Sequence, residues 1–318
     1  MRLTPPHQQL LSQTRELEVI VGGSESNTLA GLSRLGQRCC WLSRLPEQDL
    51  GQLVVQTLNA HGIDTRHVSW ADARERLGIF YTIPATPPLP GRVIYDRAQS
   101  AASRMQAGDL PQDLFAADKA RLFHSTGITA ALGKAMLATL ETAWERAGKA
   151  GWLRSFDFNF RSNLWSIQEA WSGCQPFMDT ADVVFISLRD VKARNRDEPN
   201  LQTDAEQLAW LRNHLGAKLI IITRGADGAS LLAADGRQTD YPSLTREHHG
   251  RIGRGDCFSA GFLASWLEQP DNYTRALRQA AVCAAVKSAT SGDMACFTAS
   301  QIRAVVDAGS DSAVELIR

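Results

Sequence analysis

The sequence predicts an α/β fold in which a mainly parallel central sheet carries helices on both faces and a small β lid lies beside it. Short runs of β-branched and aromatic residues at 181–186 and 218–223 alternate with helical patterns at 129–147 and 204–215. Nearly continuous apolar strands between helices are typical of a parallel sheet that is covered on both sides. One region, 77–95, has strand character without a helix and predicts the lid.

Length and composition limit the class of protein. The chain has 318 residues, of which 44% are hydrophobic and 21% charged, enough for one large α/β domain with an appendage or for two ordinary domains. Lys and Arg together number 34, as do Asp and Glu, so the formal net charge of +0 argues against nucleic acids and membrane surfaces as partners. The N-terminus lacks the apolar core of a signal peptide, and no run of about 18 apolar residues occurs. We therefore expect a cytoplasmic protein.

Glycine and proline mark where the predicted elements end. Gly36, Gly62 and Gly216 each follow a periodic segment, and Pro270 follows the last long helix described below. Between Leu77 and Tyr95, two strand-like runs flank a Pro-rich turn, which favours a hairpin-like pair outside the main sheet. We expect this pair to form a lid over the mouth of a site.

The most informative segment runs from His248 to Phe262 and places Gly253 and Gly255 directly before Asp256. The apolar residues that follow recur every four positions and predict an amphipathic helix: Phe258, Phe262 and Trp266. Backbone N–H groups at a helix N-terminus lack intrahelical partners and lie at the positive end of the helix dipole. A glycine turn that leads into such a helix can therefore hold a phosphate group through the main chain.

Asp256 is unusual in a site for phosphate alone, because a carboxylate repels a bound anion. Its position favours a base that accepts the proton of a hydroxyl as that hydroxyl attacks a phosphoryl group. The alternative is that Asp256 only caps the helix, because aspartate is a good N-cap residue after a tight turn. These residues alone favour the two interpretations equally.

The cysteines and histidines do not indicate a metal site. Six cysteines show no Cys-x-x-Cys spacing and no nearby histidine pattern, which favours reduced, packed thiols over disulfides or zinc: Cys39, Cys40, Cys174, Cys257, Cys283 and Cys296. The adjacent His248 and His249 point in opposite directions on an extended segment. We therefore predict no metal-ligating residues.

Six segments in order along the chain are similar to motifs of one superfamily. They are Val21–Asn27 with Leu32–Gly36, Tyr95–Arg97 with Ser100–Ser103, Ser125–Thr129, Asp157–Arg161 with Leu164–Trp165, Thr223–Gly228, and Lys287 with Ser291–Asp293. Together they resemble the ribokinase-like carbohydrate kinases, the PfkB family, from about residue 2 to residue 318. The Asp-x-Asn-x-Arg…Leu-Trp pattern is most similar to the 2-keto-3-deoxygluconate kinases within that family.

The resemblance implies a single ribokinase-like kinase domain over residues 1–318, with lid strands from about 1–21 and 77–100. It implies ATP-dependent phosphorylation of 2-keto-3-deoxygluconate on its terminal hydroxyl, with Mg²⁺ bridging the ATP phosphates. Asp256 would be the general base, and the glycine turn before it would be the anion hole. Lids of this type also imply a homo-oligomer that forms through the lid.

The resemblance further implies a set of binding residues. The substrate contacts are Gly23, Asn27, Tyr95, Arg97, Arg161 and Asp256. The ATP site and anion hole comprise Ser187, Thr223, Arg224, Gly225, Gly228, Gly253, Arg254 and Gly255. Arg97 and Arg161 suit a sugar acid, because a guanidinium binds a carboxylate through two parallel hydrogen bonds. The structural alternatives are a solvated lid residue for Arg97, a pair with Asp157 or another acid for Arg161, and a helix cap for Asn27.

The sequence also departs from the family pattern. The resemblance starts after the family's first strand, so we expect one central strand to be missing and two strand edges to be unpaired. Gly250 stands where an aspartate is associated with a monovalent cation, Phe80 where a tyrosine is common, and Asp190 where a glutamate is usual. The alternatives are a kinase for another sugar such as fructose and a kinase fold that binds ligand without turnover. A dehydrogenase is a weaker alternative, because no Gly-x-Gly-x-x-Gly motif opens the first βαβ unit.

Overall fold

The computed structural model describes residues 1–318 apart from 7–8, 84–89, 246–251 and 309–318. Its largest sheet contains the strands Leu122–Thr126 (β9), Leu153–Asp157 (β10), Val183–Ser187 (β11), Leu219–Thr223 (β12), Ala229–Ala233 (β13) and Gln238–Tyr241 (β14). They lie in the order β14-β13-β12-β11-β10-β9. The strands from β9 to β12 are parallel, and β13 and β14 are antiparallel at one edge. The predicted α/β fold with a mainly parallel sheet is confirmed.

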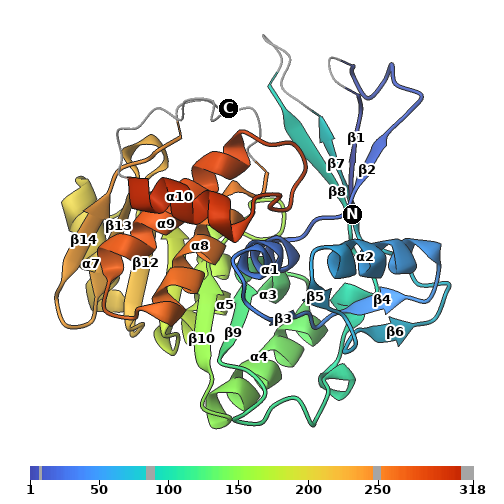
Figure 1. Cartoon of the computed structure of the whole chain (residues 1–318), viewed down its shortest axis with the longest axis horizontal. Helices are drawn as coiled ribbons and strands as arrows, with labels where there is room; N and C mark the ends of the chain where they lie inside the picture. The colour runs from blue at the N-terminus through green and yellow to red at the C-terminus, as the bar shows by residue number, and fades with distance from the viewer. Residues whose placement is uncertain (7–8, 84–89, 246–251, 309–318) are drawn as a thin grey trace.

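Helices cover both faces of this sheet (Figure 1). They are Ser24–Arg34 (α1), Asp49–Ala60 (α2), Gly127–Ala130 (α3), Lys134–Lys149 (α4), Ile167–Asp179 (α5), Leu188–Arg194 (α6), Asp204–His214 (α7), Arg254–Glu268 (α8), Tyr273–Ser288 (α9) and Ala299–Ala308 (α10). Successive side chains of β11 point to opposite faces. Val183 and Phe185 pack in the cluster that contains α8, whereas Val184 and Ile186 pack in the cluster under α4 and α5.

Most of the predicted elements are present. The strands predicted at 181–186 and 218–223 are β11 and β12, and the helix predicted at 204–215 is α7. The single helix predicted at 129–147 is wrong, because the segment forms α3 and α4. Gly133 between them has a φ of 124°, a backbone conformation that a right-handed helix cannot contain.

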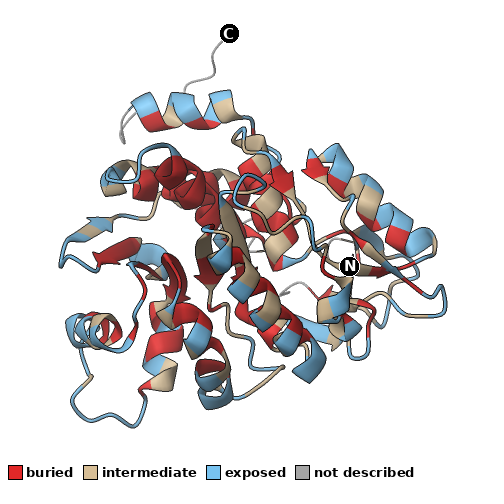
Figure 2. Ribbon diagram, turned by 90° about the horizontal axis from the view of Figure 1, so that it is seen from below, coloured by how far each residue is buried: buried red, intermediate tan, exposed pale blue. Residues whose placement is uncertain are grey.

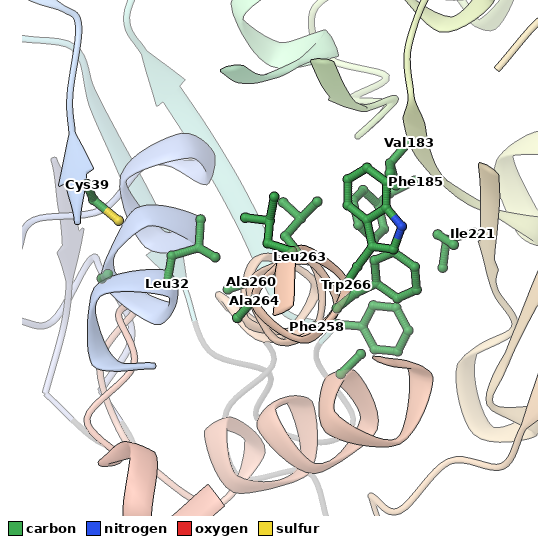
Figure 3. Packing of buried hydrophobic residues seen from close by; sticks show 14 of the residues in the cluster. Leu32, Cys39, Val183, Phe185, Ile221, Phe258, Ala260, Leu263, Ala264 and Trp266 are labelled. Atoms are coloured by element: carbon green, nitrogen blue, oxygen red, sulfur yellow. The ribbon is translucent and has the colours of Figure 1, made fainter. Parts of the chain in front are cut away.

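Helix α8 lies between α1 and the central sheet (Figure 3). Phe258 and Trp266 pack toward the strands, whereas Ala260 faces Leu32 of α1 (Figure 3). Every residue from 256 to 267 is buried, because α9 packs along a further side of the helix. The prediction of an amphipathic helix is therefore wrong, since α8 has no solvent-facing side over these residues.

A second sheet, which we call the lid, projects from the body of the molecule (Figure 1). Its strands are Arg2–Thr4 (β1), Glu18–Ile20 (β2), Ile79–Ile83 (β7) and Arg92–Asp96 (β8), in the order β2-β1-β7-β8. Strands β7 and β8 are antiparallel, as the sequence predicts, and the Pro-rich turn at 84–89 lies outside the described residues. The N-terminus lies at the base of the lid (Figure 1).

The central sheet is interrupted beyond β9. Two short parallel pairs follow there: Cys39–Cys40 (β3) with Ile63–Asp64 (β5), and Arg44–Pro46 (β4) with Ser69–Ala71 (β6). Among the described residues neither pair is hydrogen-bonded to β9. Figure 2 shows that buried positions concentrate in the middle of the molecule, whereas the outer helices expose one face.

Candidate active site

The predicted site residues gather at the carboxyl ends of the parallel strands. Asp157, Ser187 and Thr223 are the last residues of β10, β11 and β12. The N-termini of α1 and α8 reach the same edge, because the Ser24 hydroxyl of α1 is hydrogen-bonded to Asp256 of α8. Ligands of open α/β sheets bind at this edge. Here a cavity of about 1910 Å³ opens between the sheet and the lid.

All but one of the predicted residues border this cavity. The substrate set lines it completely: Gly23, Asn27, Tyr95, Arg97, Arg161 and Asp256. The nucleotide set lines it as Ser187, Thr223, Gly225, Gly228, Gly253, Arg254 and Gly255. Arg224 does not line the cavity, although both of its neighbours do, and its Nη2 pairs with Oδ1 of Asp240 at 3.3 Å. The side chain of Arg224 thus joins the loop after β12 to β14.

Asp256 is buried and held by two hydrogen bonds. The Ser24 hydroxyl donates to Oδ1 at 2.7 Å, and the Asn27 side-chain amide donates to Oδ2 at 2.8 Å. The N-cap residue of α8 is Gly253, so Asp256 does not cap that helix. Asn27 lies within α1 and does not cap it either, because the N-cap residue of α1 is Gly23. Burial raises the pKa of Asp256 to about 6, although both hydrogen bonds favour its ionised form.

A second carboxyl group lies close by. Burial, and next the charge of Asp256, raise the pKa of Asp157 to about 8. Asn159 follows at the end of β10 with a φ of 37°, and its side-chain amide donates to the Ser24 hydroxyl at 2.7 Å. The charge of Arg161 acts in the opposite direction to that of Asp256 and lowers the pKa of Asp157, so a structural role for Arg161 beside this carboxyl stays an alternative. Ser24 thus links the end of β10 to Asp256.

The turn before α8 requires glycine at residue 253. Its φ is 76°, and a Cβ there would lie 1.9 Å from the backbone oxygen of Asp293. The opposing loop is held by the buried Lys287, whose amine donates to the backbone oxygens of Gly292 at 2.8 Å and Thr290 at 3.2 Å. The first backbone bond of α8 joins the Cys257 N–H to the Gly253 oxygen, so the N–H groups of Gly255 and Asp256 have no partner within the helix and can bind an anion.

The nucleotide side of the cavity is formed by loops after β11 and β12. The Ser187 hydroxyl accepts from the Asp190 N–H at 3.1 Å and caps α6, so it supports the loop shape. A short 3₁₀ turn, Gly225–Asp227, follows β12, and Gly225 and Gly228 have φ values of 64° and 92°. A Cβ on Gly225 would meet nothing within 4 Å, which leaves open space over this loop.

The lid brings an arginine to the opposite side. The Arg97 guanidinium lies 4.2 Å from the ring centroid of Tyr95, which in turn packs against Phe80. Burial lowers the pKa of Arg97, and its Nε and Nη2 atoms are buried without a hydrogen-bond partner among the described residues. Arg161 is exposed on the loop after β10 and lines the same cavity. Since Arg97 is partly buried and stacked on Tyr95, its interpretation as a solvated lid residue is wrong.

The sequence analysis did not single out two residues of the site, Ser24 and Glu25. Ser24 bonds to a residue 232 positions away. Glu25 accepts hydrogen bonds from the N–H and hydroxyl of Thr126 and from the hydroxyl of Thr129, which ties α1 to the end of β9. Both lie in the segment Val21–Asn27, which resembles a motif of the family, but nothing local in the sequence indicates which distant groups they contact.

Other expectations concern metals, thiols and membranes. Among the described residues no group of three or more His, Cys, Asp or Glu side chains is arranged to hold a metal ion, and the six cysteines are free. No helix in the described ranges is long and apolar enough to cross a membrane. His248, His249 and Gly250 lie outside the described residues.

A buried carboxylate beside a glycine turn at a helix N-terminus, with a lid opposite, is the arrangement that a small-molecule phosphotransferase requires. The chain belongs to the pfkB family of carbohydrate kinases, whose pattern matches residues 2–300. This confirms the family expected from the sequence motifs.

Several relatives of this chain are kinases named for 2-dehydro-3-deoxy sugar acids. The chain is 34% identical to a 2-dehydro-3-deoxygalactonokinase of Haloferax volcanii over 314 residues, covering 98% of this chain and 96% of that protein. It is 29% identical to a 2-dehydro-3-deoxygluconokinase of Thermoproteus tenax, covering 86% of this chain and 81% of that protein. The crystal structure of the 2-dehydro-3-deoxygluconokinase of Thermotoga maritima has a TM-score of 0.82 and 25% identity, covering 96% of both chains.

Proposed function

We propose that this chain is an ATP-dependent kinase that phosphorylates 2-keto-3-deoxygluconate, also called 2-dehydro-3-deoxygluconate, on its terminal hydroxyl. The observation that carries the substrate class is Arg97, whose Nε and Nη2 are buried in the cavity wall without partners in the described residues. Buried polar atoms are normally paired, and a guanidinium pairs best with a carboxylate. A sugar acid supplies that carboxylate, whereas fructose and ribose do not.

Asp256 is the proposed general base. Its pKa of about 6 keeps it mainly ionised near neutral pH and close to the pH at which proton transfer is efficient. Ser24 and Asn27 donate to its two oxygens and so fix its orientation. In this proposal the N–H groups of Gly255 and Asp256 stabilise negative charge on the transferred group. Bound ATP supplies the phosphoryl group.

The residues present fit a nucleotide. We assign ATP to the Thr223–Gly228 loop, where Gly225 leaves open space, and to the α8 turn for its phosphates. We assign Mg²⁺ to the ATP phosphates, because Mg²⁺ is commonly bound through substrate phosphates. Arg224 has no part in this proposal.

The relatives favour one further candidate. The Haloferax volcanii protein acts, by its name, on the galactonate-derived acid, which differs from the gluconate-derived acid only in configuration at C4. In this proposal Arg97 and Arg161 bind the carboxylate that both acids share, so they cannot distinguish the two epimers. Both acids therefore belong in the test.

The test is ADP release with Mg-ATP and a panel of 2-keto-3-deoxygluconate, 2-keto-3-deoxygalactonate, gluconate, fructose and ribose. We expect turnover of a keto-deoxy acid, at least a ~100-fold loss of rate in Asp256→Asn, and a ~10- to 100-fold loss of kcat/KM in Arg97→Ala. Arg76→Ala is the matched control, because Arg76 lies beside the lid but pairs with Asp96 outside the cavity. Equal rates with fructose would contradict the sugar-acid assignment, and ATP binding without ADP release would favour the inactive alternative.

A further inference from the structure

Lys287 lies in the last turn of α9 and is fully buried, at 0% exposure. Its Nζ donates to the backbone oxygens of Gly292 at 2.8 Å and Thr290 at 3.2 Å. The nearby carboxylate of Asp293 pairs instead with Arg2 of the lid, at 2.8 Å between Oδ1 and Nη2. Lysine is almost never fully buried unless it is paired with an opposite charge. An ammonium that carbonyl oxygens hold in the described part of the chain therefore needs an explanation.

Stability does not explain a charge at residue 287. Removing an ammonium from water is costly, and burial lowers the pKa of Lys287. A methionine is unbranched and nearly as long, so it would fill the same space without that cost. A lysine in the last turn of a helix also interacts favourably with the helix dipole, but an exposed side chain does so equally well. The buried charge is better explained by what lies next to it.

The loop that Lys287 binds packs directly on the turn before α8. A Cβ on Gly253 would lie 1.9 Å from the backbone oxygen of Asp293 and 3.4 Å from Cε of Lys287. Gly292, whose oxygen accepts from Nζ, is the residue before Asp293. The ammonium thus holds the loop one residue away from the backbone that supports Gly253. A shift of this loop would move the turn that carries the N–H groups of Gly255 and Asp256.

We propose that Lys287 is a positioning residue for phosphoryl transfer, whose ammonium fixes the 290–293 loop against the Gly253 turn and supplies positive charge beside it. Arg2 balances the charge of Asp293, so the charge of Lys287 remains in excess at this place. A fixed charge in a water-poor site acts strongly on the negative charge that develops during transfer. The inference rests on the proposed assignment of the α8 turn to the ATP phosphates.

The test compares two variants of the full chain. Lys287→Met keeps the length of the side chain and removes its charge, whereas Lys287→Ala leaves a space beside the Gly292 and Thr290 oxygens. Backbone carbonyl oxygens bind monovalent cations, so methylammonium added to the buffer should enter this space. Ser288→Ala is the matched control, because Ser288 is buried beside Lys287 but donates to the Ala284 oxygen within its own helix.

The two readouts are kcat with Mg-ATP and the preferred keto-deoxy acid, and the Kd of ATP from titration calorimetry without turnover. We expect Lys287→Met to lose ~10- to 100-fold in kcat and ~10-fold in ATP affinity, with a Tm within about 5 °C of the wild-type value. In Lys287→Ala, methylammonium should raise kcat at least ~10-fold, whereas tetramethylammonium at the same ionic strength, which has no N–H donor, should not. The wild-type chain and Ser288→Ala should not distinguish the two salts.

Two results would overturn the proposal. One is a Lys287→Met protein with the wild-type kcat and ATP affinity, because packing alone would then be enough. The other is a Lys287→Ala protein that methylammonium improves no more than tetramethylammonium does. If Lys287→Ala does not fold, the comparison of Lys287→Met with the wild-type chain decides. If the wild-type chain phosphorylates no sugar of the panel, the proposed function fails, and the ATP affinities of the same variants still decide the role of Lys287.

Discussion

Replacing Ser24 by alanine should move the titration of Asp256 to higher pH. The Ser24 hydroxyl donates to Oδ1 at 2.7 Å and lowers the pKa of a carboxyl that burial raises to about 6. A hydrogen bond to a charged group contributes about 1.5–3 kcal/mol, and one pKa unit corresponds to about 1.4 kcal/mol. Ser24→Ala therefore raises the pKa of Asp256 by about 1–2 units. Because the base must be ionised, kcat/KM falls near pH 6.5 and recovers at about pH 9.

The assay is the pH profile of kcat/KM for ADP release with the preferred keto-deoxy acid. Ser26→Ala is the matched control, because Ser26 is buried in the same helix but donates to the Gly23 oxygen instead of Asp256. Carboxyl NMR of ¹³C-aspartate-labelled protein measures the same shift without turnover. An acid limb that stays in place in Ser24→Ala, or that moves equally in Ser26→Ala, would refute the reasoning.

Two further predictions concern stability. Burial raises the pKa of Asp157 from 3.8 to about 8 in the folded chain, so between these pH values the native state binds more protons than the unfolded state. The stability of the fold therefore falls as the pH rises through this range. Asp157→Asn should reduce the fall in Tm between pH 5 and 8, and an unchanged slope of Tm against pH would contradict this prediction. Gly253→Ala should lower the unfolding free energy in urea by at least about 2 kcal/mol, because its φ is 76° and its Cβ would lie 1.9 Å from the Asp293 oxygen. Gly255→Ala, which meets nothing within 4 Å, should change it by less than about 1 kcal/mol.

Local patterns were enough for most elements and for the edge of the sheet that carries the site. The apolar runs of β11 and β12 and the glycine turn at residue 253 are encoded by neighbours in sequence, so periodicity and turn chemistry find them. The prediction that α8 is amphipathic was wrong because it also rested on local sequence alone. Whether a helix is covered on one side or on all sides depends on α1 and α9, which its own sequence does not contain.

The sequence by itself determined the family, the α/β class, and a set of residues of which all but Arg224 meet in one cavity. Only the tertiary structure decided how they meet. It paired Arg224 with Asp240 and placed Ser24 and Asn27 on the two oxygens of Asp256. It also left Nε and Nη2 of Arg97 buried without a hydrogen-bond partner among the described residues. Hydrogen bonds and burial act over a few ångströms between segments that can be more than two hundred residues apart, so their partners, and the pKa values they set, exist only once the chain is folded.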